Sequence, residues 1–157
     1  MSALVTTEEL AQHPQWRIFD CRHDLANPEL GAQQYAEAHI PGALFAHLDH
    51  DLSAVKTDGN GRHPLPEAKK FINWLGKQGL KPTDQVVCYD GGPGAHASRL
   101  WWMLRWAGHE QAAVLDGGLA KWLREGRPVT VDVASFEAAP YAGKAKASMH
   151  ASLAVVE

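Results

Sequence analysis

Short, continuously apolar runs recur along the chain, separated by segments whose apolar residues follow helical spacing. The runs WRIFDC (16–21), ALFA (43–46), QVVCYD (85–90) and QAAVLD (111–116) have the length of buried strands. Strands without polar alternation are typical of a parallel sheet that is covered on both faces. The pattern therefore predicts an α/β fold with a central, mostly parallel sheet and helices on both faces.

Helices are expected between these strands. Thr6-Thr7-Glu8-Glu9 has the spacing of a capping box, which predicts that a short helix begins there. The stretch from His47 to Pro64 is polar and rich in turn residues, which predicts a long surface loop. Further helices are expected over 32–39, from Pro66 to Gly79, over 98–108 and over 119–126.

The pattern weakens after Val133, where alanine and small polar residues dominate. We therefore expect one domain over residues 1–135, and a linker, a tail or the start of a following domain over 136–157. A chain of 157 residues suits a single core.

Composition narrows the range of partners and compartments. The formal net charge is −3 and the isoelectric point is about 6.3, which disfavours a nucleic acid or an anionic membrane as partner. No apolar run approaches the ~20 residues of a membrane span, and MSALVTTEEL lacks the pattern of a secretory signal. The two cysteines, Cys21 and Cys88, lie in predicted strands, which predicts buried free thiols and a cytoplasmic location.

A glycine-rich loop follows the strand 85–90. Gly92, Gly94 and Ala97 have the spacing of a dinucleotide-binding loop, and Asp116 ends the next strand about 20 residues further on, where a ribose-binding acid is expected. Asp90, however, would place a carboxylate beside the pyrophosphate and oppose the field of the helix N-terminus. A dinucleotide site is therefore the weaker interpretation of this loop.

Five motifs together resemble a known family. The chain is similar, over about residues 3–133, to the N-terminal rhodanese-like domain of tandem-domain thiosulfate or 3-mercaptopyruvate sulfurtransferases. The similarity rests on HIPGALF (39–45), HPLP (63–66), VVCYDGG (86–92), SRLWWMLRWAGH (98–109) and VLDGGLAKWLREGRPV (114–129).

The resemblance implies a function for the loop. In active domains of the family a loop cysteine accepts sulfane sulfur as a persulfide, and here that position falls on Asp90. The chain is therefore expected to be the non-catalytic half of a sulfurtransferase, without cofactor or metal, beside a second, cysteine-bearing rhodanese domain or a homodimer partner. Inward-facing backbone amides are expected to make the loop an anion cradle, formed by Gly91, Gly92, Pro93, Gly94, Ala95 and His96.

Other candidate residues favour structural roles. Cys88 lies inside a predicted strand, where a buried structural thiol is expected, and Cys21 has no neighbouring base that would activate it as a nucleophile. His47 and His50 are three residues apart but lack further ligands that would complete a zinc site. His39 is expected to form local hydrogen bonds, and Asp20 and Arg22, which flank the end of the first predicted strand, are expected to pair with loop groups.

The helix from Ser98 is apolar around most of its girth. Leu100, Met103 and Leu104 form one stripe, and further apolar directions are filled by Trp101, Trp102 and Trp106. Part of this surface is expected to meet a partner domain or a second copy of the chain. Two alternatives to the architectural role stay open, an autonomous module that binds an anion or small ligand through the loop, and a dinucleotide-binding protein.

Overall fold

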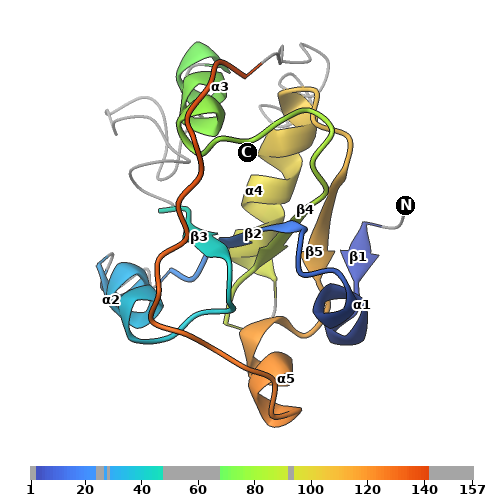
Figure 1. Ribbon diagram of the computed structural model, residues 1–157, viewed down its shortest axis with the longest axis vertical. Helices are drawn as coiled ribbons and strands as arrows, with labels where there is room; N and C mark the ends of the chain where they lie inside the picture. Colours follow the sequence, from blue (N-terminus) through green and yellow to red (C-terminus); the bar gives the residue numbers. More distant parts are fainter. Residues whose placement is uncertain (1–2, 24–26, 28, 48–67, 92–93, 142–157) are drawn as a thin grey trace.

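A five-stranded parallel sheet forms the centre of the molecule (Figure 1). The computed structural model describes residues 3–23, 27, 29–47, 68–91 and 94–141. Every neighbouring pair of strands in the sheet is parallel, which confirms the predicted α/β class. The strand order is β1-β5-β4-β2-β3, where the strands are β1 (Leu4–Val5), β2 (Arg17–Asp20), β3 (Ala43–Phe45), β4 (Val86–Tyr89) and β5 (Ala112–Leu115).

Helices cover both faces of this sheet. Figure 1 shows α3 and α4 on one face, and α1, α2 and α5 on the other. The capping box at Thr6 is present, since the Thr6 side chain and Glu9 exchange hydrogen bonds with each other's backbone amides. None of the helices among the described residues has the length and apolar character needed to cross a membrane. The helices are α1 (Thr7–Gln12), α2 (Leu30–Glu37), α3 (Ala68–Lys77), α4 (Ala95–Trp106) and α5 (Gly118–Arg124).

Two elements differ from the sequence-based expectation. The helix expected over 98–108 begins earlier, at Ala95, directly after Gly94, whose φ of 91° is a left-handed conformation that glycine adopts readily. The two-residue strand β1 is not predicted from the sequence, because so short a segment carries no recognisable period. It pairs with the end of β5, through Leu4 with Val114 and Val5 with Leu115.

The strands divide their side chains between two cores. On β4, Val86 and Cys88 face the α3–α4 core, and Val87 and Tyr89 face the core under α1, α2 and α5. All four are fully buried, which explains why the run shows no polar alternation.

The tryptophans of α4 belong mainly to the α3–α4 core. Trp106 is 1% exposed and packs against Phe71 of α3 and Trp102 of its own helix. Trp101 is partly buried, and its indole N–H donates to the Ala112 carbonyl at 3.1 Å. The girth of the helix is therefore apolar largely because α3 and β5 cover it within the domain.

The chain continues to pack on the domain as far as residue 141, beyond the boundary expected at 135. The Ala139 amide donates to the Gly76 carbonyl in α3 at 3.1 Å, and Tyr141 is buried. These attachments use backbone groups and single side chains, which leave no periodic pattern in an alanine-rich sequence. The rest of the segment expected to be a linker or tail, residues 142–157, lies outside the described residues.

The role of Trp106 in the core can be tested by truncation. Trp106→Ala should lower the free energy of unfolding by about 3–5 kcal/mol, because it leaves a large cavity among fully packed neighbours. Leu123→Ala is the matched control, since Leu123 is 50% exposed, and it should change stability by less than about 0.5 kcal/mol. Urea unfolding followed by circular dichroism measures both, and equal effects would contradict the assignment of Trp106 to the core.

Candidate functional site

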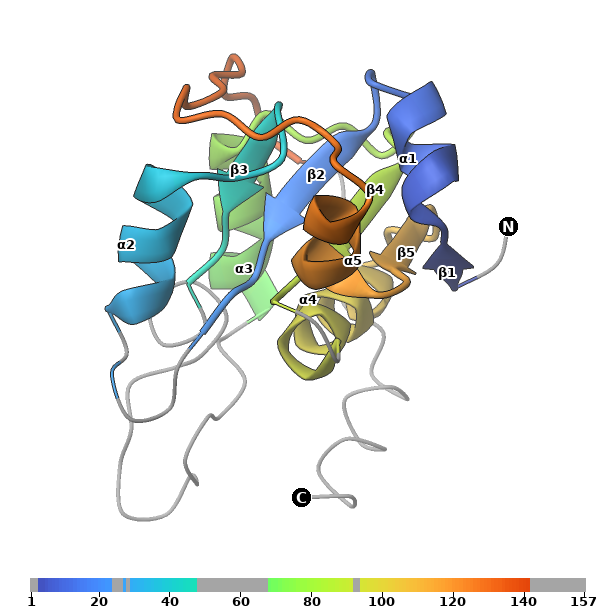
Figure 2. The same cartoon turned by 90° about the horizontal axis from the view of Figure 1, so that it is seen from below.

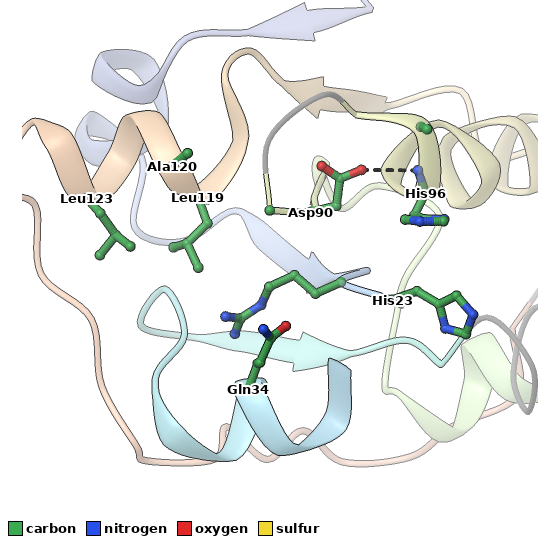
Figure 3. Close-up of a pocket in the computed structure, with 10 residues that line it drawn as sticks. His23, Gln34, Asp90, His96, Leu119, Ala120 and Leu123 are labelled. Carbon is green, nitrogen blue, oxygen red and sulfur yellow. Dashed lines mark hydrogen bonds between the residues drawn. The ribbon is translucent and has the colours of Figure 1, made fainter. Parts of the chain in front are cut away.

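A pocket of about 510 Å³ opens at the carboxyl ends of β2 and β4 (Figure 3). Figure 3 shows Gln34 of α2 facing Leu119 and Leu123 of α5 across it, with His23 and His96 at one side. The carboxyl ends of parallel strands are where open α/β sheets place their sites. The lining residues are Arg22, His23, Gln34, Asp90, Gly91, Ala95, His96, Leu119, Ala120 and Leu123.

Asp90 lies in this wall as a buried carboxylate, 2% exposed, that caps α4. Its Oδ1 accepts from the Gly94 amide at 3.0 Å, and its Oδ2 from the amides of His96 and Ala97 at 3.0 and 3.1 Å. Figure 3 shows the contact with His96. Amides at the start of a helix have no acceptors within the helix, and here the Asp90 carboxylate provides the missing acceptors. The helix field also favours a negative charge there.

The loop after β4 is tied to α5 as well as to α4. The carbonyl of Asp90 accepts from the Leu119 amide at 2.9 Å, and the carbonyl of Gly91 accepts from the Ala120 amide at 3.1 Å. Of the residues predicted for the cradle, the pocket brings Gly91, Ala95 and His96 together beside Asp90, and Gly94 binds its carboxylate. Gly92 and Pro93, also predicted for the cradle, lie outside the described residues.

The amides at the start of α4 already bind an anion, which is the side chain of Asp90. A pyrophosphate in the same loop would have to displace the Asp90 carboxylate from three hydrogen bonds. Asp116, the expected ribose-binding acid, is exposed and does not line the pocket, while its amide donates to the Val5 carbonyl at 2.8 Å. The geometry thus argues against a dinucleotide site.

A second buried carboxylate, Asp20, organises the end of β2. It accepts from the Arg22 Nε and Nη2 atoms at 2.9 and 2.7 Å and from the Tyr89 hydroxyl at 2.8 Å. Burial, and then the negative charge of Asp20, hold the pKa of Tyr89 well above its usual value, so the phenol stays a donor. Asp20 and Arg22 thus pair with each other, whereas the sequence led us to expect pairing with loop groups, and Arg22 also donates to the Ala38 carbonyl at 2.6 Å.

Neither cysteine is placed as a nucleophile. Cys21 is 2% exposed and Cys88 is fully buried, as expected from their positions in strands. Burial is the main reason that the pKa of Cys21 lies well above its usual value, and the neighbouring Cys88 and the charges of Asp20 and Asp90 raise it further. A thiol in that environment is a poor source of thiolate.

Comparison with known proteins decides which family this site belongs to. The sequence matches the model of the rhodanese-like domain over residues 6–125. The chain belongs to the rhodanese-like family. It is 43% identical over 151 residues to a probable 3-mercaptopyruvate sulfurtransferase of Pseudomonas aeruginosa, covering 93% of this chain and 53% of that protein. It is 32% identical over 160 residues to the thiosulfate sulfurtransferase of Rattus norvegicus, covering 96% and 52% respectively.

A solved structure has the same fold. The 3-mercaptopyruvate sulfurtransferase from Leishmania major superposes with a TM-score of 0.84 at 32% identity, over 92% of this chain and 41% of that one. The rhodanese-like chain thus spans about half the length of the curated relatives that it matches.

The candidate histidines His39 and His47 are both buried in this rhodanese-like domain. His39 is fully buried, and its ring nitrogens contact the carbonyls of Tyr35 and Asp132 at 2.7 and 2.6 Å, which confirms local hydrogen bonding. His47 is buried and lies edge-on to His23 at 5.9 Å, while its predicted neighbour His50 lies outside the described residues. Within the described part of the chain, no three His, Cys, Asp or Glu side chains gather as a metal ion would require.

Several pocket residues are not evident from the sequence. Gln34, Leu119, Ala120 and Leu123 lie on helices, where their side chains resemble ordinary helix surface. His23 carries a clearer signal, because it follows Arg22 at the carboxyl end of a predicted strand.

Replacing Asp90 tests the cap. Asp90→Ala leaves the first amides of α4 without their acceptor and should lower the free energy of unfolding by about 1–3 kcal/mol. Asp90→Asn, which keeps one carbonyl acceptor, should lose less. The matched control is Asp116→Asn at an exposed carboxylate, expected to stay within about 0.5 kcal/mol of the parent. If chemical denaturation shows the parent and Asp90→Ala to be equally stable, the carboxylate is not the cap.

Proposed function

We propose that this rhodanese-like domain is the half of a longer sulfurtransferase that lacks the nucleophile and shapes one wall of the cleft. A second, cysteine-bearing half would carry the sulfur. The observation that carries the proposal is the Asp90 carboxylate, seated on amides at 3.0 to 3.1 Å where the family resemblance expects a cysteine. Relatives named as 3-mercaptopyruvate and thiosulfate sulfurtransferases are about twice as long, which leaves room for that second half.

The chemistry of a carboxylate supports a non-catalytic role. Sulfane sulfur is carried on sulfur, as a persulfide, and an oxygen nucleophile does not form that bond. The chain's own thiols do not replace it, because Cys21 and Cys88 are buried in the α3–α4 core. The Cys21 thiol is also engaged in a weak hydrogen bond, which it donates to the Phe19 carbonyl at 3.8 Å.

The geometry of the carboxylate supports the alignment of Asp90 with the nucleophile position. A carboxylate oxygen of aspartate lies two bonds beyond Cβ, and so does the terminal sulfur of a cysteine persulfide. Both groups carry negative charge at that point, which backbone amides at a helix N-terminus stabilise. The cradle that holds Asp90 therefore has a shape and polarity that would suit a persulfide.

The pocket supports a role as one wall of a larger cleft. Leu119 and Leu123 give it an apolar side, and Leu123 is 50% exposed. An exposed leucine beside the pocket suits the apolar part of a contact with another domain. A second domain of the same longer chain is the partner we favour, and a homodimer partner is the other.

The alternative role as an anion-binding module is less well supported. Such a module would use the loop amides, but Asp90 accepts from them. The guanidinium in the pocket wall, that of Arg22, is paired with Asp20 at 2.7 Å, so the two charges offset each other. With the carboxylate of Asp90 added, the pocket wall does not favour an incoming anion.

Activity measurements test the proposal directly. The 157-residue chain should produce no thiocyanate from cyanide with thiosulfate or 3-mercaptopyruvate as donor, since its described thiols are buried. A separately expressed second half, taken from a full-length relative, should gain turnover when this chain is added. Turnover by the chain alone that Cys21→Ser abolishes would overturn the proposal, as would a second half that is fully active without this chain.

Introducing a thiol tests the position of Asp90. With thiosulfate, the thiolate of Asp90→Cys should take the outer sulfur atom, breaking the S–S bond of thiosulfate and releasing sulfite. The gain in mass of one sulfur atom should occur only on the peptide that contains the substituted position, because the amides there stabilise a persulfide. Asp90→Ser is the matched control, of similar size but unable to hold sulfane sulfur. Mass spectrometry of the peptides measures both, and sulfur found on Cys21 or Cys88 instead would show that the nucleophile position lies elsewhere.

A further inference from the structure

Residues 127–141, here called the strap, cross the sheet from one layer of helices to the other. Figures 1 and 2 both show this orange-to-red segment leaving α5, passing β3 and reaching α3. It passes the amino ends of the strands, since the ring of Phe136 lies 3.6 Å from the guanidinium of Arg17, the first residue of β2. The pocket lies at the opposite, carboxyl ends.

The strap is held by few groups. Of residues 127–141, all of which the structure describes, Tyr141 alone is buried, while Val131 and Val133 are 63% and 68% exposed. Near its start, Thr130 exchanges backbone hydrogen bonds of 2.8 and 2.9 Å with His39. A segment with little buried apolar area and a few polar attachments belongs to the low-stability part of a fold. The position of the far end of the strap therefore depends on the contacts of Tyr141.

Tyr141 is held by a buried histidine. Its hydroxyl lies 2.7 Å from Nδ1 of His109, whose Nε2 lies 2.7 Å from the carbonyl of Asp84. A carbonyl only accepts, so Nε2 carries the proton and donates to Asp84. In the neutral ring Nδ1 is then an acceptor, and the Tyr141 hydroxyl donates to it. Both hydrogen bonds of the His109 ring, one from the Tyr141 hydroxyl and one to the Asp84 carbonyl, are therefore formed when the imidazole is neutral.

We propose that Tyr141 and His109 form a proton-sensitive latch, which holds the end of the strap on α3 when His109 is neutral and releases it when His109 is protonated. Protonation turns Nδ1 into a donor, so the Tyr141 hydroxyl can keep the contact only as an acceptor, with its own proton turned away from the ring. Protonation also places a charge among buried groups. His109 is 1% exposed, which makes that charge costly.

The surroundings of His109 set the direction of the pH dependence. The titratable or charged groups that face it are Tyr141 on the strap, Asp84 before β4 and Glu110 beside it, of which Glu110 pairs with Arg105 at 3.3 Å. Burial outweighs the two acidic groups and the backbone carbonyls, and it lowers the pKa of His109. Burial likewise raises the pKa of Tyr141 to about 12, so the phenol keeps its proton.

The sign of the pH dependence follows from linkage. With the strap open, His109 approaches its ordinary pKa of about 6.5, so the open form binds a proton more readily than the closed form. The latch is therefore intact above about pH 6.5 and weakens as the pH falls, by up to about tenfold in the opening equilibrium for each pH unit. Opening back to Phe136 would lengthen the tether to any following domain by about 17 Å, at roughly 3.4 Å per extended residue.

Amide hydrogen exchange of the 157-residue chain, measured by NMR from pH 7.5 to 5.0, tests the latch. After correction for intrinsic exchange rates, the Ala139 amide, bound to Gly76, should lose protection as His109 titrates. The Cys21 amide, bound to the Tyr89 carbonyl between two central strands, reports global unfolding and should change less. Protection at Ala139 that is absent at pH 7.5, or that does not change with pH relative to Cys21, would overturn the latch.

Two tyrosine variants distinguish the effect of the latch from the general effect of removing a buried hydroxyl. Tyr141→Phe should lower protection at Ala139 already at pH 7.5 and should flatten its pH dependence. Tyr35→Phe is the matched control, because Tyr35 and Tyr141 are each 8% exposed and the Tyr35 hydroxyl donates to Ala43, away from the strap end. The latch is wrong if Tyr141→Phe keeps the parent's pH dependence, or if Tyr35→Phe removes it equally. The outcome does not depend on any sulfur-transfer activity.

Discussion

The hydrogen bonds from three backbone amides to the Asp90 carboxylate hold together the edge of the sheet on which the site depends. They cap α4, and the carbonyl of the same residue accepts from Leu119 at the start of α5. One residue thus fixes the turn after β4 relative to two helices. A cysteine at this point would satisfy the amides less well until it carried a further sulfur. The aspartate supplies a negative charge that the amides and the helix field stabilise. In our proposal this stability takes the place of reactivity at the nucleophile position.

Two buried carboxylates at this edge are neutralised in different ways. Asp20 is offset by a guanidinium that also binds the Ala38 carbonyl, so it joins β2 to the segment that leads into β3. Asp90 is offset by oriented amides and the helix field. Because each of these charges already has its partner, the pocket offers an incoming molecule mainly the apolar surface of α5, with Gln34, His23 and His96 beside it. That composition suits packing against another domain better than capture of a charged metabolite.

Most of the fold and the central feature of the site could be predicted from the sequence. Strands buried on both faces leave continuous apolar runs, so β2, β4 and β5 are visible, and their order with the helices indicates the α/β class. Asp90 is visible because glycine loops after parallel strands are common sites and a carboxylate is unusual in one. The strap could not be predicted. Tyr141 is attached through its hydroxyl and the neighbouring chain through the Ala139 amide, and single attachments of this kind produce no periodic pattern of apolar residues. Gln34 and Leu123 escape prediction because a helix surface becomes a pocket wall only through tertiary packing.

The strap and the pocket lie at opposite ends of the same strands. At the amino ends, the strap packs over Arg17, whose guanidinium also donates to the carbonyls of Gln78 and Gly79 at 2.5 and 2.9 Å. At the carboxyl ends, the residues after β2 and β4 line the pocket. β2 connects the two ends directly, with Arg17 at its first position and Asp20 at its last. Both of these charges are held by partners outside residues 137–141, so β2 would keep its position if the far end of the strap opened as proposed. In our two proposals, the carboxyl edge keeps its shape for a neighbouring domain, while the latch at the amino edge sets the length of the tether to that domain.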